Sequence, residues 1–302
     1  MKKNDRIAID GVFLLDKSTG ITSNSALQRV KRIFNAKKAG HTGALDPLAT
    51  GLLPICFGEA TKFSQFLLDS VKSYRVSAQL GVRTTTSDSE GDVISRRPVD
   101  ISLNDIKEKL PYFLGNVMQK PTMYSALKYQ GQPLYKYARA GIHVDVKARP
   151  ITIYKNTLLN YENNILELDI TCSKGTYIRT VIDDLGQLLE CGAHVIALRR
   201  TGVAHYQEED MMTLEALENQ IDNQDKLLQP IDSMLVDLPI VSLSLSQSDE
   251  ILCGQRIVLQ DNLSLHQCYR IYQQYGTSSL FLGIGQCISE GVLAPKRLVN
   301  LS

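Results

Sequence analysis

The sequence predicts an α+β protein built on a mixed, mainly antiparallel sheet flanked by helices, with a small β-rich domain at its C-terminal end. Two observations favour this class. Segments with the period of two that is typical of strands occur beside segments of helical period, without the strict alternation of parallel βαβ units. From Pro239 onward, short runs of Val, Ile and Leu are separated by glycines, a pattern typical of a small β domain.

Periodicity places the elements of the first seventy residues. The apolar run at 12–15 predicts a buried strand, and residues 16–20 predict the turn after it. Ser23 is the expected N-cap of a helix, because its hydroxyl can accept a bond from a free backbone N–H of the first turn. The apolar face of this helix would consist of Leu27, Val30, Ile33 and Phe34. A second helix is expected over residues 60–68.

Two later segments, residues 74–80 and 166–173, alternate apolar and polar residues. Alternation of this kind is typical of strands with one buried face. Residues 177–189 carry apolar side chains at helical spacing, which predicts a helix directly after the second strand. Residues 120–153 are basic, aromatic and rich in turn-forming residues, which indicates an insertion on the surface.

Residues 40–51 read Gly-His-Thr-Gly-Ala-Leu-Asp-Pro-Leu-Ala-Thr-Gly. Three glycines and a proline in this stretch predict a loop with several special backbone angles, and mostly apolar residues follow it. Such a loop would hold the carboxylate of Asp46 against an apolar wall, which suits a reacting group. The alternative is a plain turn in which Asp46 bonds its own backbone before Pro47.

Charge is unevenly distributed, although the net charge of the 302 residues is only +1. Residues 1–40 carry nine Lys and Arg against three Asp, and residues 120–155 carry seven against one, so each segment has a local charge of +6. Residues 207–239 carry one against nine, a local charge of −8. This separation predicts one electropositive face, as an RNA-binding protein needs, although such clusters can also be ordinary solvated surface.

The composition is that of a soluble globular protein, with 43% hydrophobic and 22% charged residues. No apolar run approaches the ~18 residues of a membrane-spanning helix, and no signal peptide is expected. The six cysteines are scattered without the spacing of a zinc site, so reduced thiols and a cytoplasmic location are expected. His41 has no second His or Cys at ligand spacing, which argues against a metal site.

The loop at 40–51 resembles the catalytic motif of the TruB family of tRNA pseudouridine synthases. The resemblance continues in further blocks in the same order, over roughly the first 200 residues. These blocks are Leu53–Lys62, Ser73–Val76, Met123–Ala126, Arg149–Tyr154, Cys172–Thr180, Cys191–Val195 and Leu198–Arg200. The resemblance implies the pseudouridine synthase fold, with a catalytic domain at 1–238, a basic RNA-contacting insertion at 120–153 and a PUA-like RNA-binding domain at 239–302.

The resemblance also implies roles for residues of the site. Asp46 stands where the family has its nucleophile, and Arg179 where it has its basic active-site residue, a cation that would keep the carboxylate charged. Tyr74 matches the tyrosine that stacks on the uracil and handles the C5 proton. Tyr177 and Leu198 match positions that line the uridine pocket.

Further residues are expected to contact the RNA around the reacting nucleotide. His41 offers a planar ring that can stack on the neighbours of a flipped uridine and ring nitrogens that can bond them. Lys17, Lys62 and Lys128 are expected to contact phosphates, together with the insertion at 120–153.

The implied activity is isomerisation of uridine 55 in the T loop of tRNA to pseudouridine, by Asp-dependent glycosidic cleavage and carbon–carbon reattachment after base flipping. No redox change occurs and no outside group enters, so no cofactor is expected. The expected partner is the tRNA T-arm stem-loop, bound by a monomer without a membrane, guide RNA or obligate protein partner.

Two other functions are compatible with the sequence. A non-catalytic RNA binder, such as a folding chaperone for tRNA, would use the same electropositive face and would not need Asp46. A guide-RNA-dependent pseudouridine synthase carries a related Asp motif, but it would be expected to have longer basic tails than this chain.

Overall fold

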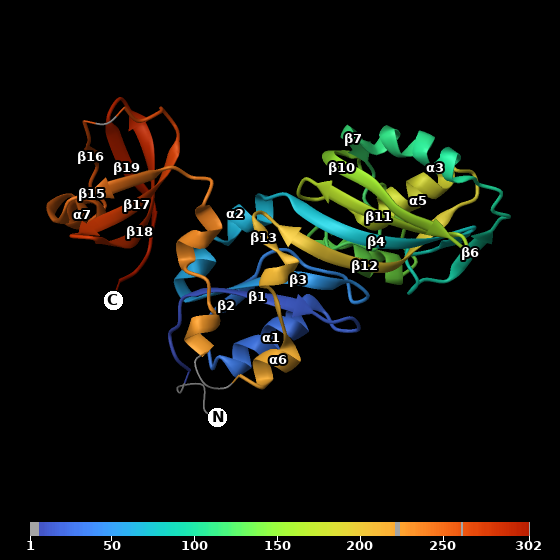
Figure 1. Ribbon diagram of the computed structural model, residues 1–302, viewed down its shortest axis with the longest axis horizontal. Helices are drawn as coiled ribbons and strands as arrows, with labels where there is room; N and C mark the ends of the chain where they lie inside the picture. The colour runs from blue at the N-terminus through green and yellow to red at the C-terminus, as the bar shows by residue number, and fades with distance from the viewer. Residues whose placement is uncertain (1–5, 221–223, 261, 302) are drawn as a thin grey trace.

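The computed structural model describes residues 6–220, 224–260 and 262–301, which form a large sheet, a smaller sheet and two two-stranded hairpins (Figure 1). The large sheet has ten strands. In spatial order its main path is β14 (Met212–Thr213), β1 (Gly11–Lys17), β3 (Thr50–Phe57), β12 (Ala193–Val203), β4 (Lys72–Leu80), β11 (Ile165–Cys172), β10 (Arg149–Glu162) and β7 (Gly115–Gln119). Two short strands lie off this path: β2 (Ala39–His41) pairs with β3, and β13 (Tyr206–Gln207) pairs with β12.

Most neighbouring strands of the large sheet are antiparallel. The described exceptions are β1 with β14 and β3 with β12, which are parallel. The expected class, a mixed and mainly antiparallel sheet flanked by helices, is therefore confirmed. The helices are α1 (Ser23–Ile33), α2 (Ser64–Asp69), α3 (Leu103–Lys109), α4 (Leu134–Arg139), α5 (Ile178–Leu188), α6 (Leu214–Glu218) and α7 (Leu245–Leu252). Within the described ranges, no helix is both long and apolar enough to span a membrane.

Shorter elements complete the chain. The 3₁₀ turns are η2 (Gly58–Lys62), η3 (Leu110–Phe113), η4 (Glu208–Asp210), η5 (Gln224–Leu227) and η6 (Ile231–Leu235). A hairpin of β5 (Val82–Thr84) and β6 (Val93–Arg96) follows β4. The segment at 120–153 contains α4 and a small hairpin of β8 (Lys128–Tyr129) and β9 (Gln132–Pro133), which lie in the sequence between the edge strand β7 and its neighbour β10.

The main hydrophobic core lies between one face of the large sheet and the helices α1 and α5. The alternation predicted for β4 is present: Val76, Ala78 and Leu80 are buried in this core. On β11, which pairs with β4, Leu166, Leu168 and Ile170 point to the same core. Period-two sequences thus produce one continuous apolar face that the amphipathic helices cover.

The small sheet forms the C-terminal domain, drawn in orange and red in Figure 1. Its order is β15 (Ile240–Leu243), β17 (Cys268–Tyr275), β18 (Ser278–Ser289), β19 (Val292–Leu298) and β16 (Ile257–Val258). The small sheet has its own core. A second apolar cluster joins it to the first half of the large sheet, where the ring of Phe63 lies 5.7 Å from the ring of Phe281.

Two local predictions differ from the structure. The N-cap of α1 is Thr22, whose side chain accepts from the Ser25 amide, while the hydroxyl of Ser23 is buried and bonds Leu45 instead. The helix expected over 60–68 is divided into η2 and α2 at Phe63, because Phe63 turns its ring into the interdomain cluster. In both cases a tertiary contact decides a feature that local propensity left open.

Helix α5 approaches β12 closely because its residue 186 is a glycine. A Cβ added at Gly186 would lie 2.2 Å from the backbone nitrogen of Ala193, the first residue of β12. Glycine is unfavourable within a helix, so its presence is explained by this close contact. The contact matters for the site because α5 carries Arg179 in its first turn.

We expect Gly186→Ala to lower the free energy of unfolding by about 1–3 kcal/mol, because overpacking costs more than the gain in helix propensity. Urea unfolding followed by circular dichroism measures this change. Glu108→Ala, on the exposed face of α3, should leave stability within about 0.5 kcal/mol. A Gly186 variant as stable as the parent would contradict the tight packing of α5.

Candidate active site

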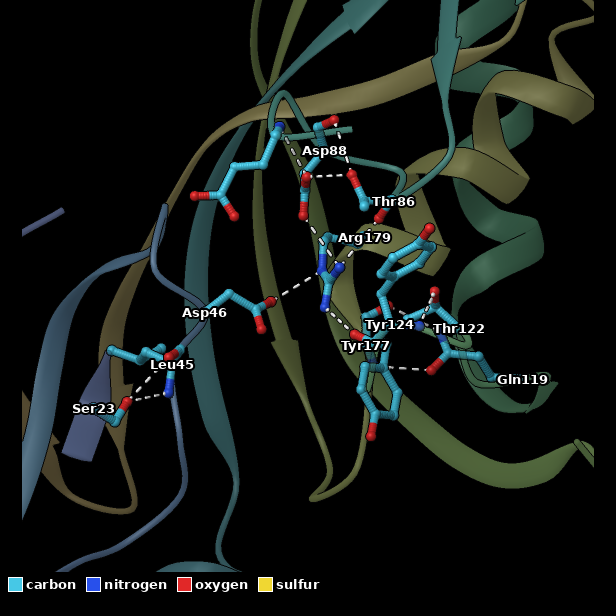
Figure 2. Close-up of polar contacts among 11 residues, drawn as sticks. Ser23, Leu45, Asp46, Thr86, Asp88, Gln119, Thr122, Tyr124, Tyr177 and Arg179 are labelled. Carbon is cyan, nitrogen blue, oxygen red and sulfur yellow. Dashed lines mark hydrogen bonds and ion pairs between the residues drawn. The ribbon is translucent and has the colours of Figure 1, made fainter. Parts of the chain in front are cut away.

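The predicted loop joins β2 to β3, and we call residues 42–49 the Asp46 loop. Its backbone is fixed from several sides. The hydroxyl of Ser23 donates to the Leu45 carbonyl at 3.0 Å and accepts from the Leu45 amide at 2.7 Å (Figure 2). The Gly20 amide donates to the Pro47 carbonyl at 2.9 Å. The loop is therefore a rigid support and not a free turn.

The side chain of Asp46 faces Arg179 across the site (Figure 2). Its Oδ2 lies 2.9 Å from Nε of Arg179, which is in the first turn of α5. The Arg179 side chain is only 6% exposed, whereas 41% of the Asp46 side chain is exposed. No described residue donates a hydrogen bond to Oδ1 of Asp46. One carboxylate oxygen is held by the protein, and the other is open to a ligand.

Besides its ion pair with Asp46, the guanidinium of Arg179 donates three further hydrogen bonds within the protein. Its Nη1 donates to Oδ2 of Asp88 and to the Thr86 carbonyl, both at 3.1 Å, and its Nη2 donates to the Tyr124 carbonyl at 2.9 Å. A buried guanidinium needs its donors satisfied, and here the acceptors come from three separate segments. Arg179 therefore fixes the relative positions of the Asp46 loop, the β5–β6 connection and the insertion at 120–153.

Asp88 is the second carboxylate of this network, and its side chain is 3% exposed. Its Oδ1 accepts from the Thr86 hydroxyl at 2.5 Å and from the Glu90 amide at 3.0 Å, while Oδ2 accepts from Arg179. Each oxygen of Asp88 thus has its own donors. Sequence reasoning missed this residue, and it would have been difficult to find because the segment 85–92 holds three acidic residues of similar surroundings.

Opposing effects act on the ionisation of Asp46. Removal from water raises the pKa of its carboxyl above the usual value, the positive charge of Arg179 counteracts this, and the negative charge of Asp88 adds to it. The carboxylate therefore accepts a proton more readily than a free aspartate does. Such a group suits a role in bond breaking better than a fully solvated carboxylate.

The predicted pocket residues come from the central strands and from the start of α5. Tyr74 and Leu198 lie on the adjacent central strands β4 and β12, where Leu198 is opposite Val76 and Tyr74 is opposite Arg200. Tyr177 is the N-cap residue of α5, and its backbone exchanges two hydrogen bonds with the side chain of Gln119. Burial raises the pKa of both phenols, and the charge of Asp46 raises them further.

His41 lies at the start of the loop, in β2. Burial and the positive charge of Arg200 lower the pKa of its imidazole, so the ring is neutral near pH 7. Its Nδ1 is buried, and no described residue bonds it. Among the residues of known placement, no group of three His, Cys, Asp or Glu side chains is arranged to hold a metal ion.

The three lysines expected to contact phosphates differ in placement. Lys17 is fully buried, and its ammonium donates to the carbonyls of Ser18 and Ile21 at 2.9 Å and of Pro47 at 3.4 Å. The expectation for Lys17 is therefore corrected: it supports the loop from inside. Its burial lowers the pKa of the ammonium to about 8.

Lys62 also has partners within the protein. Its ammonium bonds the Leu298 carbonyl of the C-terminal domain at 3.0 Å and pairs with Glu59, so its main contact connects the two domains. Lys128 is exposed on β8 in the insertion, as a phosphate contact requires. Of the three lysines, the geometry favours Lys128 as the one that contacts phosphate.

Comparison with known proteins gives family matches over residues 31–236 and 239–299. The N-terminal domain of TruB family pseudouridylate synthases matches residues 31–178. The C-terminal domain of tRNA pseudouridylate synthase B matches residues 179–236, and the TruB C-terminal domain of pseudouridine synthase II matches residues 239–299. The last match begins at the residue where the sequence predicted the β-rich domain to begin.

Relatives match over nearly their full length. A protein of Shewanella sp. (strain MR-4) named tRNA pseudouridine synthase B is 55% identical, covering 96% of this chain and 94% of that protein. The protein of the same name from Vibrio vulnificus (strain YJ016) is 53% identical, covering 96% of this chain and 95% of its own.

Solved structures share the fold at lower identity. A chain in the structure of an H/ACA RNP bound to a substrate RNA containing 2'-deoxyuridine superimposes with a TM-score of 0.74 and 22% identity, over 96% of this chain and 85% of that chain. A chain of a Cbf5-Nop10-Gar1 complex gives a TM-score of 0.71 at 22% identity, over 96% and 84%. With the sequence relatives, these results establish that the chain belongs to the TruB family of tRNA pseudouridine synthases.

Proposed function

We propose that this protein isomerises uridine 55 in the T loop of tRNA to pseudouridine, and that Asp46 is the carboxylate that carries the reaction. One observation supports the proposal most strongly. Asp46 is held by Arg179 through a single oxygen, while its other oxygen is open on a rigid loop. The relatives named tRNA pseudouridine synthase B, at 53–55% identity, support the substrate class.

The chemistry fits one positioned carboxylate. The bond between ribose C1′ and uracil N1 breaks, the base turns, C1′ joins C5, and the C5 proton leaves while N1 gains one. No electrons are exchanged with another molecule, so no cofactor is needed. A carboxylate can attack C1′, add to C6, or assist loss of the C2′ proton, and each route uses a carboxylate at this position.

Arg179 would orient Asp46 and keep it ionised when the uridine excludes water. Exclusion of water raises the pKa of a carboxyl further, and a cation 2.9 Å away opposes that rise. Because Arg179 is itself fixed by Asp88 and two carbonyls, the carboxylate is pre-oriented before the substrate binds. Pre-orientation of this kind is a major source of catalytic rate.

Tyr74 and His41 would act on the base and its surroundings. Tyr74 lies on β4 opposite Arg200, and the charge of Asp46 acts on its phenol. Its ring can stack on the flipped uracil, and its hydroxyl can take part in transfer of the C5 proton. The neutral ring of His41 can stack on a nucleotide beside the flipped one. Tyr177 and Leu198 would line the uridine pocket.

The RNA would be held mainly outside the pocket. The insertion at 120–153 is basic and carries exposed Lys128, and the C-terminal domain offers a second contact region. We propose that the protein acts as a monomer in the cytoplasm without guide RNA. The support for independence from a guide is that its relatives at over 50% identity are named as tRNA enzymes.

Asp46→Asn tests the proposal directly. We expect tritium release from a T-arm stem-loop labelled at C5 of uridine to fall at least about 1,000-fold, because the amide can neither attack nor stabilise positive charge. Affinity for the stem-loop should stay within about threefold. The stem-loop is supplied without any other RNA, so release by the parent also tests independence from a guide. Retained release in the variant would exclude Asp46 from the reaction.

Asp88→Asn tests whether Asp88 holds the guanidinium of Arg179 in position. The amide nitrogen must face a donor, whether Arg179 on one side or the Glu90 amide on the other, so we expect turnover to fall about 100-fold. Because the charge of Asp88 raises the pKa of Asp46, its removal lowers that pKa, and the acid limb of the rate–pH profile should move to lower pH.

The matched control for Asp88→Asn is Asp169→Asn. Asp169 lies on β11 and pairs with the exposed Lys155. This variant should keep parental turnover within about threefold and leave the acid limb in place. An acid limb that moves to higher pH in Asp88→Asn would contradict the assigned charge effect.

Lys17→Met separates a supporting lysine from one that contacts phosphate. We expect the free energy of unfolding to fall by about 1–3 kcal/mol, since buried carbonyls lose their donor. The slope of log affinity for tRNA against log salt concentration should stay unchanged. Lys128→Met should keep stability and reduce that slope by about 0.7–0.9, one phosphate contact. A reduced slope in Lys17→Met would show that Lys17 does contact a phosphate, as the sequence predicted.

A further inference from the structure

Arg200 is a buried cation without a carboxylate partner among the described residues. Its side chain lies on the central strand β12 and is 1% exposed. Burial of a charged group is costly unless hydrogen bonds compensate. The neighbouring Arg199, in contrast, is one-third exposed and pairs with Asp16 and Glu208. The contacts of Arg200 must therefore explain its position.

The guanidinium of Arg200 bonds the backbone near the start of the Asp46 loop and in β3, just beyond the end of the loop. Its Nη2 donates to the carbonyl of Gly43 at 3.1 Å, and its Nε donates to the carbonyl of Leu52 at 2.7 Å. Asp46 lies in the segment between these two carbonyls. One planar group with donors on different edges can hold two such points at a fixed distance.

The backbone of Arg200 lies between the two halves of the site. It is paired with Gly51 of β3 on one side and with Tyr74 of β4 on the other. Because residues directly opposite each other share a face of the sheet, Arg200 and Tyr74 point to the same side. The loop that carries Asp46 and the strand that carries Tyr74 thus meet at this residue.

Two glycines adapt the loop to Arg200. Gly51 has a φ of +98°, and a Cβ there would lie 2.3 Å from the Arg200 carbonyl oxygen. Gly43 has a φ of +89°, and a Cβ there would lie 3.5 Å from Nη1 of Arg200. These glycines of the conspicuous 40–51 segment let the backbone pass close to the buried arginine.

The positive charge of Arg200 acts on several groups of the site. It lowers the pKa of the His41 imidazole and opposes the effect of burial on the pKa of the Tyr74 phenol. It further lowers the pKa of the ammonium groups of Lys17 and Lys72.

We infer that Arg200 is a positioning residue of the site: its guanidinium ties the start of the Asp46 loop and the strand that follows the loop to β12, whose neighbour β4 carries Tyr74, and so fixes the separation of the Asp46 carboxylate and the Tyr74 phenol. The inference deepens the proposed function and rests on the roles given there to Asp46 and Tyr74. Arg200 itself acts through these two side chains and through the backbone.

Arg200→Met tests the inference in the full-length protein. We expect amide hydrogen exchange over residues 42–52 to accelerate at least about tenfold, because two carbonyl contacts are lost. In protein labelled with 3-fluorotyrosine, the ¹⁹F resonance of Tyr74, assigned through Tyr74→Phe, should titrate at higher pH once the cation is removed. Turnover of the T-arm stem-loop should fall about 100-fold, with KM within about threefold.

Two further variants separate charge from geometry. Arg200→Lys keeps a cation but cannot bridge two carbonyls as a planar fork does, so exchange over 42–52 should still accelerate while the Tyr74 titration stays near that of the parent. Arg199→Met removes the adjacent guanidinium, whose ion pairs lie elsewhere, and should leave both readouts unchanged.

Unchanged exchange over 42–52 in Arg200→Met, together with an unmoved Tyr74 titration, would overturn the inference. A uniform acceleration of exchange across both domains would also overturn it, because it would indicate general destabilisation. Neither readout needs a substrate. They therefore decide the role of Arg200 even if Asp46→Asn retains tritium release and the proposed function fails.

Discussion

The candidate site depends on the ion pairs and hydrogen bonds that the guanidinium of Arg179 makes. It is buried, so each of its donors needs an acceptor, and the acceptors come from the Asp46 loop, the segment around Asp88 and the insertion at 120–153. These segments are far apart in the sequence and have no common strand. One satisfied cation therefore fixes their arrangement, and the orientation of Asp46 follows from it.

Three other buried cations, all on strands of the large sheet, have their hydrogen-bond donors satisfied in a different way. Lys17, Lys72 and Arg200 all bond backbone carbonyls, and none pairs with a carboxylate in the part of the chain that the structure describes. Carbonyl bonds satisfy the donors but leave the positive charge in place. Of these three cations, Lys17 opposes the rise that burial causes in the pKa of the Asp46 carboxyl. Two of these bonds, from Lys17 to the Pro47 carbonyl and from Arg200 to the Gly43 carbonyl, restrain the Asp46 loop.

Local sequence patterns could predict the scaffold but only part of the site. Alternation in 74–80 and 166–173 predicted the central strands because a half-buried strand requires that period. The glycines of 40–51 predicted a constrained loop, and the pairing of Asp46 with Arg179 is present as expected. Asp88 could not be predicted, because an acidic residue in a polar connection looks the same whether it is buried or solvated.

What the sequence alone determined is the class of fold, the strands and helices of the central sheet, and the loop that presents Asp46. These follow from periodicity and from the backbone demands of glycine and proline, which act over a few residues. Only the tertiary structure decided that Lys17 and Arg200 lie inside, that Lys62 joins the domains, and that Asp88 shares Arg179 with Asp46. The physical reason is that burial and partners of a charged side chain depend on segments that meet only after folding.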